Sequence, residues 1–264
     1  MSHEFDLDTA VVRGSDGVYA AELTDRWNTL GERPNGGYVL AAAVRALREA
    51  VGAPDPFAIS AHFLRPATPG PAAIHTELVR SGRRISTGEA RLVQDGKEIV
   101  RAVASFTDLA AAEGRTLVLA QPPALPAPEA AIDLLAGGSP AGVTILGRYD
   151  YRVAAIPGWA QGKPNGDPSL SCWLRFRDGR ANDTLGLLAM VDAAWPAVLE
   201  LGELGSSTVE LTVHVRARPA PGWLACRVST RIVSGGYHEE DFEIWDADGK
   251  LVAQSRQLAV LPPR

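Results

Sequence analysis

The chain of 264 residues repeats one order of landmarks, and this repeat limits its architecture more than any other sequence feature. Three short motifs recur at an offset of 152 or 153 residues: His62 and His214, Pro69-Gly70 and Pro221-Gly222, and Asp95-Gly96-Lys97 and Asp248-Gly249-Lys250. Agreement of all three in the same order predicts an internal duplication. We therefore expect two copies of one structural unit that pack as a single pseudo-symmetric body.

Each copy begins with a helical pattern and continues with strand-like segments. In the first copy, a helix is predicted from Pro34 to Ala50, and strands are predicted over residues 58–64, 73–81, 89–94 and 99–106. In the second copy, a helix capped by Asn182 or Asp183 is predicted over residues 183–199, followed by strands over residues 208–216, 223–233, 239–246 and 251–261.

A helix that is apolar around much of its circumference needs cover on several sides. An antiparallel sheet that wraps the helix supplies this cover, so the predicted class is α+β and the predicted architecture is a double hotdog. Many alanines and the prolines at 122, 123, 126 and 128 indicate a surface linker over residues 110–147. The expected units are therefore residues 1–109 and 148–264.

Composition argues against several other classes of protein. With 26 Lys and Arg against 31 Asp and Glu, the formal charge of −5 argues against nucleic-acid binding. No basic segment followed by an apolar one opens the chain, and Arg45 and Arg48 interrupt the alanine-rich helix, so we expect no membrane span and a cytoplasmic protein. Cys172 and Cys226 are expected to be buried, reduced thiols. The histidine and glycine spacings predict neither a metal nor a cofactor.

Short motifs in both halves occur in an order and spacing that can be compared with known families. They are His62-Phe63-Leu64-Arg65-Pro66, Val79-Arg80-Ser81-Gly82, Gln94-Asp95-Gly96-Lys97 and Ala104-Ser105-Phe106, then Arg218-Pro219, Gly222-Trp223-Leu224, Asp248-Gly249-Lys250-Leu251-Val252-Ala253 and Gln257. In this order and spacing the chain resembles the bacterial and peroxisomal acyl-CoA thioesterase II family. The resemblance implies a double-hotdog hydrolase whose substrate is an acyl-CoA thioester.

Asp192 stands out on the predicted second helix before any family is considered. Leu185, Leu188, Asp192 and Trp195 fall on one apolar stripe, which places a carboxylate among buried side chains. A general base in a cleft would explain this placement. Alternatively, the helix ends early because of Pro196, and Asp192 lies at its frayed, solvent-exposed end. The offset of 152 puts Leu40 at the matching position, so we expect one active site per chain.

Two further residues are candidates for holding a water. Gln257 lies on the inward set of its predicted strand, where a structural hydrogen bond would explain it equally well, and Thr208 needs no functional explanation as a β-branched strand residue. The resemblance implies that an Asp, Thr and Gln set holds the attacking water, and matching the segments places this set on Asp192, Thr208 and Gln257. The Thr208 match requires one inserted residue before Arg218-Pro219.

Substrate contacts are expected from backbone and from arginine. Gly36 and Gly37 let a carbonyl approach the first N–H groups of a helix, which favours an oxyanion site, although an ordinary helix entry would look the same. Arg80, Arg83 and Arg84 could contact the phosphates of CoA, or could simply be solvated at a turn.

The repeated histidines, His62 and His214, are expected to pack or to pair strands rather than to catalyse. The predicted function is hydrolysis of fatty acyl-CoA to free acid and CoA, and self-association into a homo-oligomer is expected. The alternative is a non-catalytic double hotdog that binds acyl-CoA or an acyl chain. A hydratase is disfavoured because Ala197, and not a histidine, stands five residues after Asp192.

Overall fold

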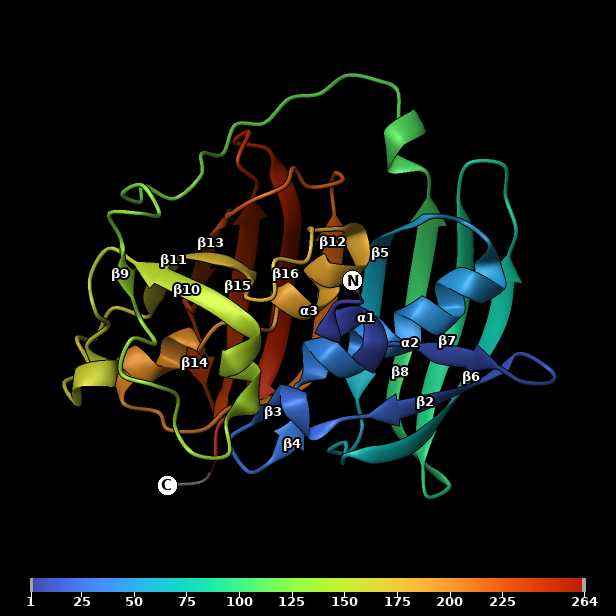
Figure 1. Ribbon diagram of the computed structural model, residues 1–264, viewed down its shortest axis with the longest axis horizontal. Helices are drawn as coiled ribbons and strands as arrows, with labels where there is room; N and C mark the ends of the chain where they lie inside the picture. Colours follow the sequence, from blue (N-terminus) through green and yellow to red (C-terminus); the bar gives the residue numbers. More distant parts are fainter. Residues whose placement is uncertain (1, 263–264) are drawn as a thin grey trace.

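The computed structural model describes residues 2–262 and contains one 14-stranded antiparallel sheet (Figure 1). The strands of the first half are β1 (Val11–Arg13), β2 (Val18–Leu23), β5 (Asp55–Phe63), β6 (Gly70–Arg80), β7 (Ser86–Gln94) and β8 (Lys97–Thr107). Those of the second half are β9 (Ile132–Asp133), β10 (Tyr149–Val153), β11 (Ser169–Phe176), β12 (Ser207–Val215), β13 (Leu224–Ser229), β14 (Val233–Ser234), β15 (Tyr237–Trp245) and β16 (Leu251–Val260).

The two halves meet at the central strands β5 and β12. Outward from this pair the order is β8, β7, β6, β2, β1 on one side and β16, β15, β13, β11, β10, β9 on the other, while β14 pairs with β15. Ser60 pairs with Thr212, and these residues are themselves 152 positions apart, so the pseudo-twofold of the proposed repeat passes through this pair. The register at the joint therefore agrees with the spacing of the sequence motifs.

The first predicted helix is present as α2 (Gly36–Val51). Asn35 caps it by accepting a hydrogen bond from the Tyr38 N–H, and Gly52 ends it in the left-handed conformation with φ 73°. The helix packs against β6, β7 and β8 and against the helix α3 (Thr184–Met190) of the other half (Figure 1). Its residues from Gly37 to Val44 are all buried, as expected for a helix covered on several sides.

The prediction of a long second helix over residues 183–199 is wrong. The helix α3 (Thr184–Met190) has only two turns, and a separate 3-10 segment, η5 (Ala197–Leu201), follows it. Pro196 has no N–H to donate to the carbonyl of Asp192 four residues earlier, and it disfavours a helical Trp195. Asn35 of the first half donates its side-chain N–H to that carbonyl instead, at 2.8 Å.

All eight predicted strands are present within two or three residues of their expected bounds, except that the segment predicted over 223–233 is divided between β13 and β14. Missing from the sequence prediction are the strands that precede each helix, among them β2 and β10, and the short helix α1 (Glu4–Asp8). His62 and His214 lie on the two central strands with exposed side chains, so a packing role is wrong for both.

Residues 112–131 contain no helix or strand, and Figure 1 shows this segment passing beyond the ends of the strands from the first half to the second. Short 3-10 segments, η2 (Leu109–Ala111) and η3 (Thr144–Arg148), lie near the ends of the predicted linker, residues 110–147. Cys172 and Cys226 face each other on β11 and β13, both buried and both free. Within residues 2–262, no helix is long and apolar enough to cross a membrane.

Candidate active site

Asp192 lies in the turn after α3, where the second half meets the N-terminus of α2. Its Oδ2 accepts a hydrogen bond from the Gly37 N–H at 2.8 Å and from the Asn35 side-chain amide at 2.9 Å. No described residue donates to its Oδ1. The positive end of the α2 dipole also faces the carboxylate. One oxygen is therefore held in place while the other remains available for a proton.

The two glycines of α2 allow this close contact. A Cβ at Gly37 would lie 2.8 Å from the Ala189 carbonyl oxygen and 2.9 Å from the Asp192 Cβ. A Cβ at Gly36 would lie 3.0 Å from Asp192 Oδ2 and 3.0 Å from the Phe63 ring. Small residues are thus required here because the turn that carries Asp192 presses against the first turn of α2.

The surroundings of Asp192 adjust its acidity. Burial raises the pKa of Asp192 to about 6, while the hydrogen bonds from Gly37 and Asn35 oppose the rise. A carboxylate with this pKa is mostly ionised at neutral pH, yet it binds a proton far more readily than an exposed aspartate. These are the properties that a general base needs.

Thr208 and Gln257 lie together on neighbouring strands, β12 and β16. The Thr208 hydroxyl donates to Gln257 Oε1 at 2.7 Å, and the Gln257 Nε2 donates to Oε1 of Glu240 at 2.8 Å. The other oxygen of Glu240 accepts from the N–H of Ala197 at 2.6 Å. Neither Thr208 nor Gln257 is hydrogen-bonded to Asp192 among the described residues, but Ala197, the first residue of η5, lies only five residues after Asp192.

A β-bulge explains why Thr208 faces inward. Counting back in twos from the buried Leu211 would place Thr208 on the outer face of the sheet. The register instead shifts between Thr208 and Glu210, which leaves Val209 without a partner and turns Thr208 to the inner face beside Gln257. The match to the family requires one extra residue between Thr208 and Arg218-Pro219. The unpaired Val209 lies in this interval.

Glu240 was missed by the sequence analysis. Its side chain is only 5% exposed, and burial raises its pKa to about 8, with a smaller contribution from the charge of Asp192. The alternation of β15 carried the signal, because His238, Glu240, Phe242 and Ile244 form its buried set. Glu240 lies on the same face of the strand as Phe242 and Ile244, so its carboxyl is expected to point into the core.

The structure separates the arginine cluster from Asp192. Arg80, Arg83 and Arg84 are exposed at the β6–β7 turn. This turn lies beyond the C-terminal end of α2, since Leu47 and Val51 contact the β6–β7 pair near Gly88. Asp192 lies at the opposite end of a 16-residue helix, which is about 24 Å long.

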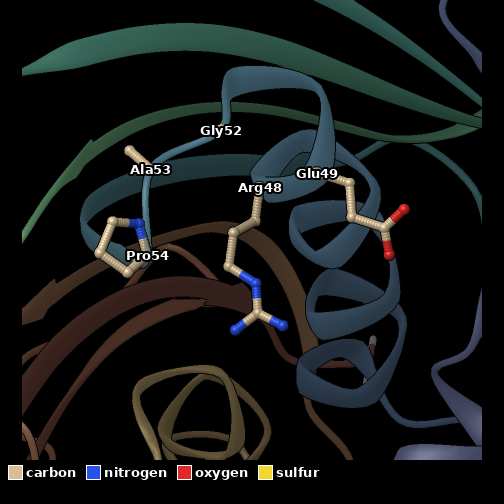
Figure 2. Close-up of a pocket in the computed structure, with 5 residues that line it drawn as sticks. All are labelled: Arg48, Glu49, Gly52, Ala53 and Pro54. Atoms are coloured by element: carbon tan, nitrogen blue, oxygen red, sulfur yellow. The ribbon is translucent and has the colours of Figure 1, made fainter.

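An open surface hollow of about 430 Å³ lies at the C-terminal end of α2. Its lining residues, drawn in Figure 2, are Arg48, Glu49, Gly52, Ala53 and Pro54. It does not include Asp192, Thr208 or Gln257. Across residues 2–262, no group of three or more His, Cys, Asp and Glu side chains is arranged to hold a metal ion.

Comparison with known proteins places these features in one family. The model of the acyl-CoA thioesterase N-terminal domain matches residues 23–107, and that of the acyl-CoA thioesterase C-terminal domain matches residues 119–261. The uncharacterised protein Rv0499 of Mycobacterium tuberculosis is 31% identical over 270 residues, which cover 93% of this chain and 91% of the relative.

Solved structures agree in fold. A candidate thioesterase II from Thermobifida fusca is 34% identical, with a TM-score of 0.87 and coverage of 99% of this chain and 98% of that one. A conserved protein of unknown function with a hotdog fold from Alicyclobacillus acidocaldarius is 24% identical, with a TM-score of 0.88 and full coverage of both chains. The fold is therefore of the hotdog type, and the chain belongs to the acyl-CoA thioesterase family.

Proposed function

We propose that this protein hydrolyses fatty acyl-CoA to a free acid and CoA, with Asp192 as the general base. The observation that carries the proposal is the state of the Asp192 carboxylate. Asn35 and Gly37 hold its Oδ2, its pKa is about 6, and its Oδ1 is left without a described donor. A water that donates a hydrogen bond to Oδ1 would be oriented and activated there.

The proposed reaction needs no covalent enzyme intermediate. The water oxygen attacks the thioester carbonyl carbon, its proton passes to Asp192, and the carbonyl electron pair moves to the oxygen. When the tetrahedral intermediate collapses, the C–S bond breaks and the leaving thiolate of CoA takes the proton from Asp192. Thr208 and Gln257 would fix the water, since their polar groups lie on the inner face near the same connection.

The oxyanion is assigned to Gly36 rather than shared with Gly37. The Gly37 N–H already donates to Asp192, so that donor holds the base. Gly36 is the first residue of α2, is partly accessible, and its N–H has no partner among the described residues. An N–H at a helix start is well suited to a developing negative charge.

The finer organisation is proposed on the same basis. We infer two tandem hotdog units, residues 1–109 and 148–264, joined by the linker at 110–147, with α2 as the central helix of the first unit. We also propose that the chain forms a homo-oligomer.

Arg80, Arg83 and Arg84 are proposed to contact the phosphates of CoA, which requires the CoA arm to extend along α2. If they do, changing these arginines to alanine should raise KM without lowering kcat.

A series of acyl-CoA thioesters of increasing chain length, with release of the CoA thiol as the readout, tests the function. Turnover that is abolished by Asp192→Asn supports it. The alternative function, acyl-CoA binding without catalysis, predicts ligand-dependent protection against thermal unfolding with no thiol release from any member of the series.

A further inference from the structure

We propose that Glu240 is a positioning residue that sets the direction of the hydrogen bonds from Gln257 to Thr208 and thereby determines how Thr208 meets the attacking water. The inference rests on the proposed hydrolysis and extends it to a residue outside the predicted Asp, Thr and Gln set. Glu240 contacts neither the water nor the substrate in this scheme, and it acts through Gln257.

The direction of the chain follows from the chemistry of its members. An ionised carboxylate only accepts hydrogen bonds, so the group of Gln257 that faces Glu240 must be the NH₂ and not the carbonyl. Gln257 Oε1 then points to Thr208. The Thr208 hydroxyl donates its single hydrogen to that oxygen, at an O···O distance of 2.7 Å. Thr208 Oγ1 is left as an acceptor.

An acceptor at Thr208 suits the proposed reaction. A water that donates one proton to Asp192 and the other to Thr208 Oγ1 keeps a lone pair free to attack the thioester carbonyl. If the Gln257 amide were reversed, its NH₂ would donate to Thr208, and the hydroxyl proton would point at the water. The water would then accept that hydrogen bond through one of its two lone pairs, which lowers the nucleophilicity of its oxygen.

Glu240 also ties this chain to the connection that carries the base. Its second oxygen accepts the Ala197 N–H at 2.6 Å, five residues after Asp192. The side chain is 5% exposed, so both contacts are made away from bulk water, where they are strongest. One buried carboxyl therefore contacts both Gln257 and the segment that follows Asp192.

Two charged groups act on Glu240 from the elements around it. Asp192, on the connection after α3, and Glu239, its neighbour on β15, both add to the rise that burial causes in its pKa, to about 8. The other neighbours are neutral donors: the Ala197 N–H, and Gln257 on β16. His238 on β15 is held neutral, because burial lowers its pKa. As pH rises through 8, the ionised form that orders the chain becomes populated.

The test compares Glu240→Gln with a matched control, Glu200→Gln. Glu200 is also a buried carboxyl that accepts backbone N–H groups, from Gly158 and Asn165, but among the described residues it makes no hydrogen bond to Gln257. A glutamine at 240 can accept only one of the two hydrogen bonds, and its NH₂ favours the reversed amide of Gln257. We expect kcat to fall about 10- to 100-fold with little change in KM, the scale of a lost orientation. The wild-type rise in rate near pH 8 should also be absent.

A double-mutant cycle separates positioning from general damage. In a Thr208→Val background there is no hydroxyl to orient, so Glu240→Gln should reduce kcat no further. Glu200→Gln should keep the rate rise near pH 8. Equal losses of kcat from Glu240→Gln in both backgrounds, or a pH profile unchanged by Glu240→Gln, would overturn the inference while leaving the hydrolysis itself intact.

A second measurement does not depend on turnover. The side-chain amide signals of Gln257 in a ¹⁵N–¹H spectrum, assigned by their loss in Gln257→Ala, should shift with a midpoint near pH 8 in the wild type and not in Glu240→Gln. Absence of that titration in the wild type would refute the inference. If no acyl-CoA is hydrolysed but the titration is present, the proposed function fails and the link between Glu240 and Gln257 stands.

Discussion

Asn35 donates its side-chain N–H groups to both the main-chain oxygen and the carboxylate of Asp192, at 2.8 and 2.9 Å. The same side chain caps α2, because its Oδ1 accepts the Tyr38 N–H at 3.1 Å. One amide therefore begins the helix of the first half and fixes the turn of the second half that carries the carboxylate. The candidate site exists only where the two halves meet.

The Asp192→Asn variant should lose activity and gain stability. Loss of a general base should lower kcat by about 100-fold or more. The folded-state pKa of about 6 lies above the ordinary value of 3.8, so the ionised group destabilises the fold above pH 6. Removing its charge should add about 1–3 kcal/mol of stability at pH 7, measured by urea unfolding. A less stable variant at pH 7 would contradict this account of Asp192.

The pH dependence of kcat/KM should show the ionisation of Asp192. The base is protonated and inactive below its pKa, so the rate should rise with pH and reach half of its first plateau near pH 6. Asp192→Asn should show residual activity without this rise. A wild-type profile that is flat between pH 5 and 7, measured with a substrate stable over this range, would exclude Asp192 as the base.

The Asn35→Ser variant separates capping from the contact with Asp192. Serine can still accept the Tyr38 N–H, but it has no amide to donate to the carboxylate. Without that donor the pKa of Asp192 should rise by about one to two further units, since a hydrogen bond to a charged group contributes about 1.5–3 kcal/mol. The rise in kcat/KM should move to higher pH by the same amount, while α2 remains folded by circular dichroism. An unmoved profile would show that Asn35 serves only as a cap.

Sequence reasoning located the elements better than it located the site. The α2 helix could be predicted because a cap, a helical apolar pattern and a terminal glycine agree, and the strands around the two Asp-Gly turns could be predicted for similar reasons. The α3 helix could not, because its short length depends on Pro196 and on a contact from Asn35, 157 positions away. The sequence marks Asp192 by its charge, but the helix predicted to carry it ends at Met190.

Matching between the halves also depends on which element is compared. The strands keep an offset of 152, whereas the two helix caps, Asn35 and Asp183, are 148 residues apart. Counted from the caps, Val44 and not Leu40 corresponds to Asp192. Both are fully buried and apolar, so the first half has no carboxylate at either position. Either comparison therefore supports the proposal of one base per chain.

Alanine at Gly37 should be far more damaging than alanine at Gly36. The Gly37 Cβ would meet two backbone carbonyl oxygens, of Leu188 and Ala189, at 2.8–2.9 Å, and neither can move without shifting α3. The Gly36 Cβ would meet the Asp192 carboxylate and the Phe63 ring at 3.0 Å, and side chains can adjust. We expect losses of about 2–4 and about 0–2 kcal/mol respectively. Equal unfolding midpoints for the two variants would show that α3 does not press on α2 as described.

The joint between the halves should depend on Asp55, which opens β5 and is only 3% exposed. Its carboxylate accepts hydrogen bonds from the Thr184 hydroxyl at the start of α3, from the Leu109 N–H and from Arg218. Asp55→Ala would leave the buried Thr184 hydroxyl and the Leu109 N–H without their acceptor, whereas the half-exposed Arg218 keeps its ion pair with Asp108, so a loss of about 2–4 kcal/mol is expected. Asp241→Ala is the control, because Asp241 makes its ion pairs with Arg231 and Arg256 on the exposed face, where such pairs contribute about 0–1 kcal/mol. Urea unfolding at pH 7 compares the two, and similar losses would mean that Asp55 does not hold the halves together.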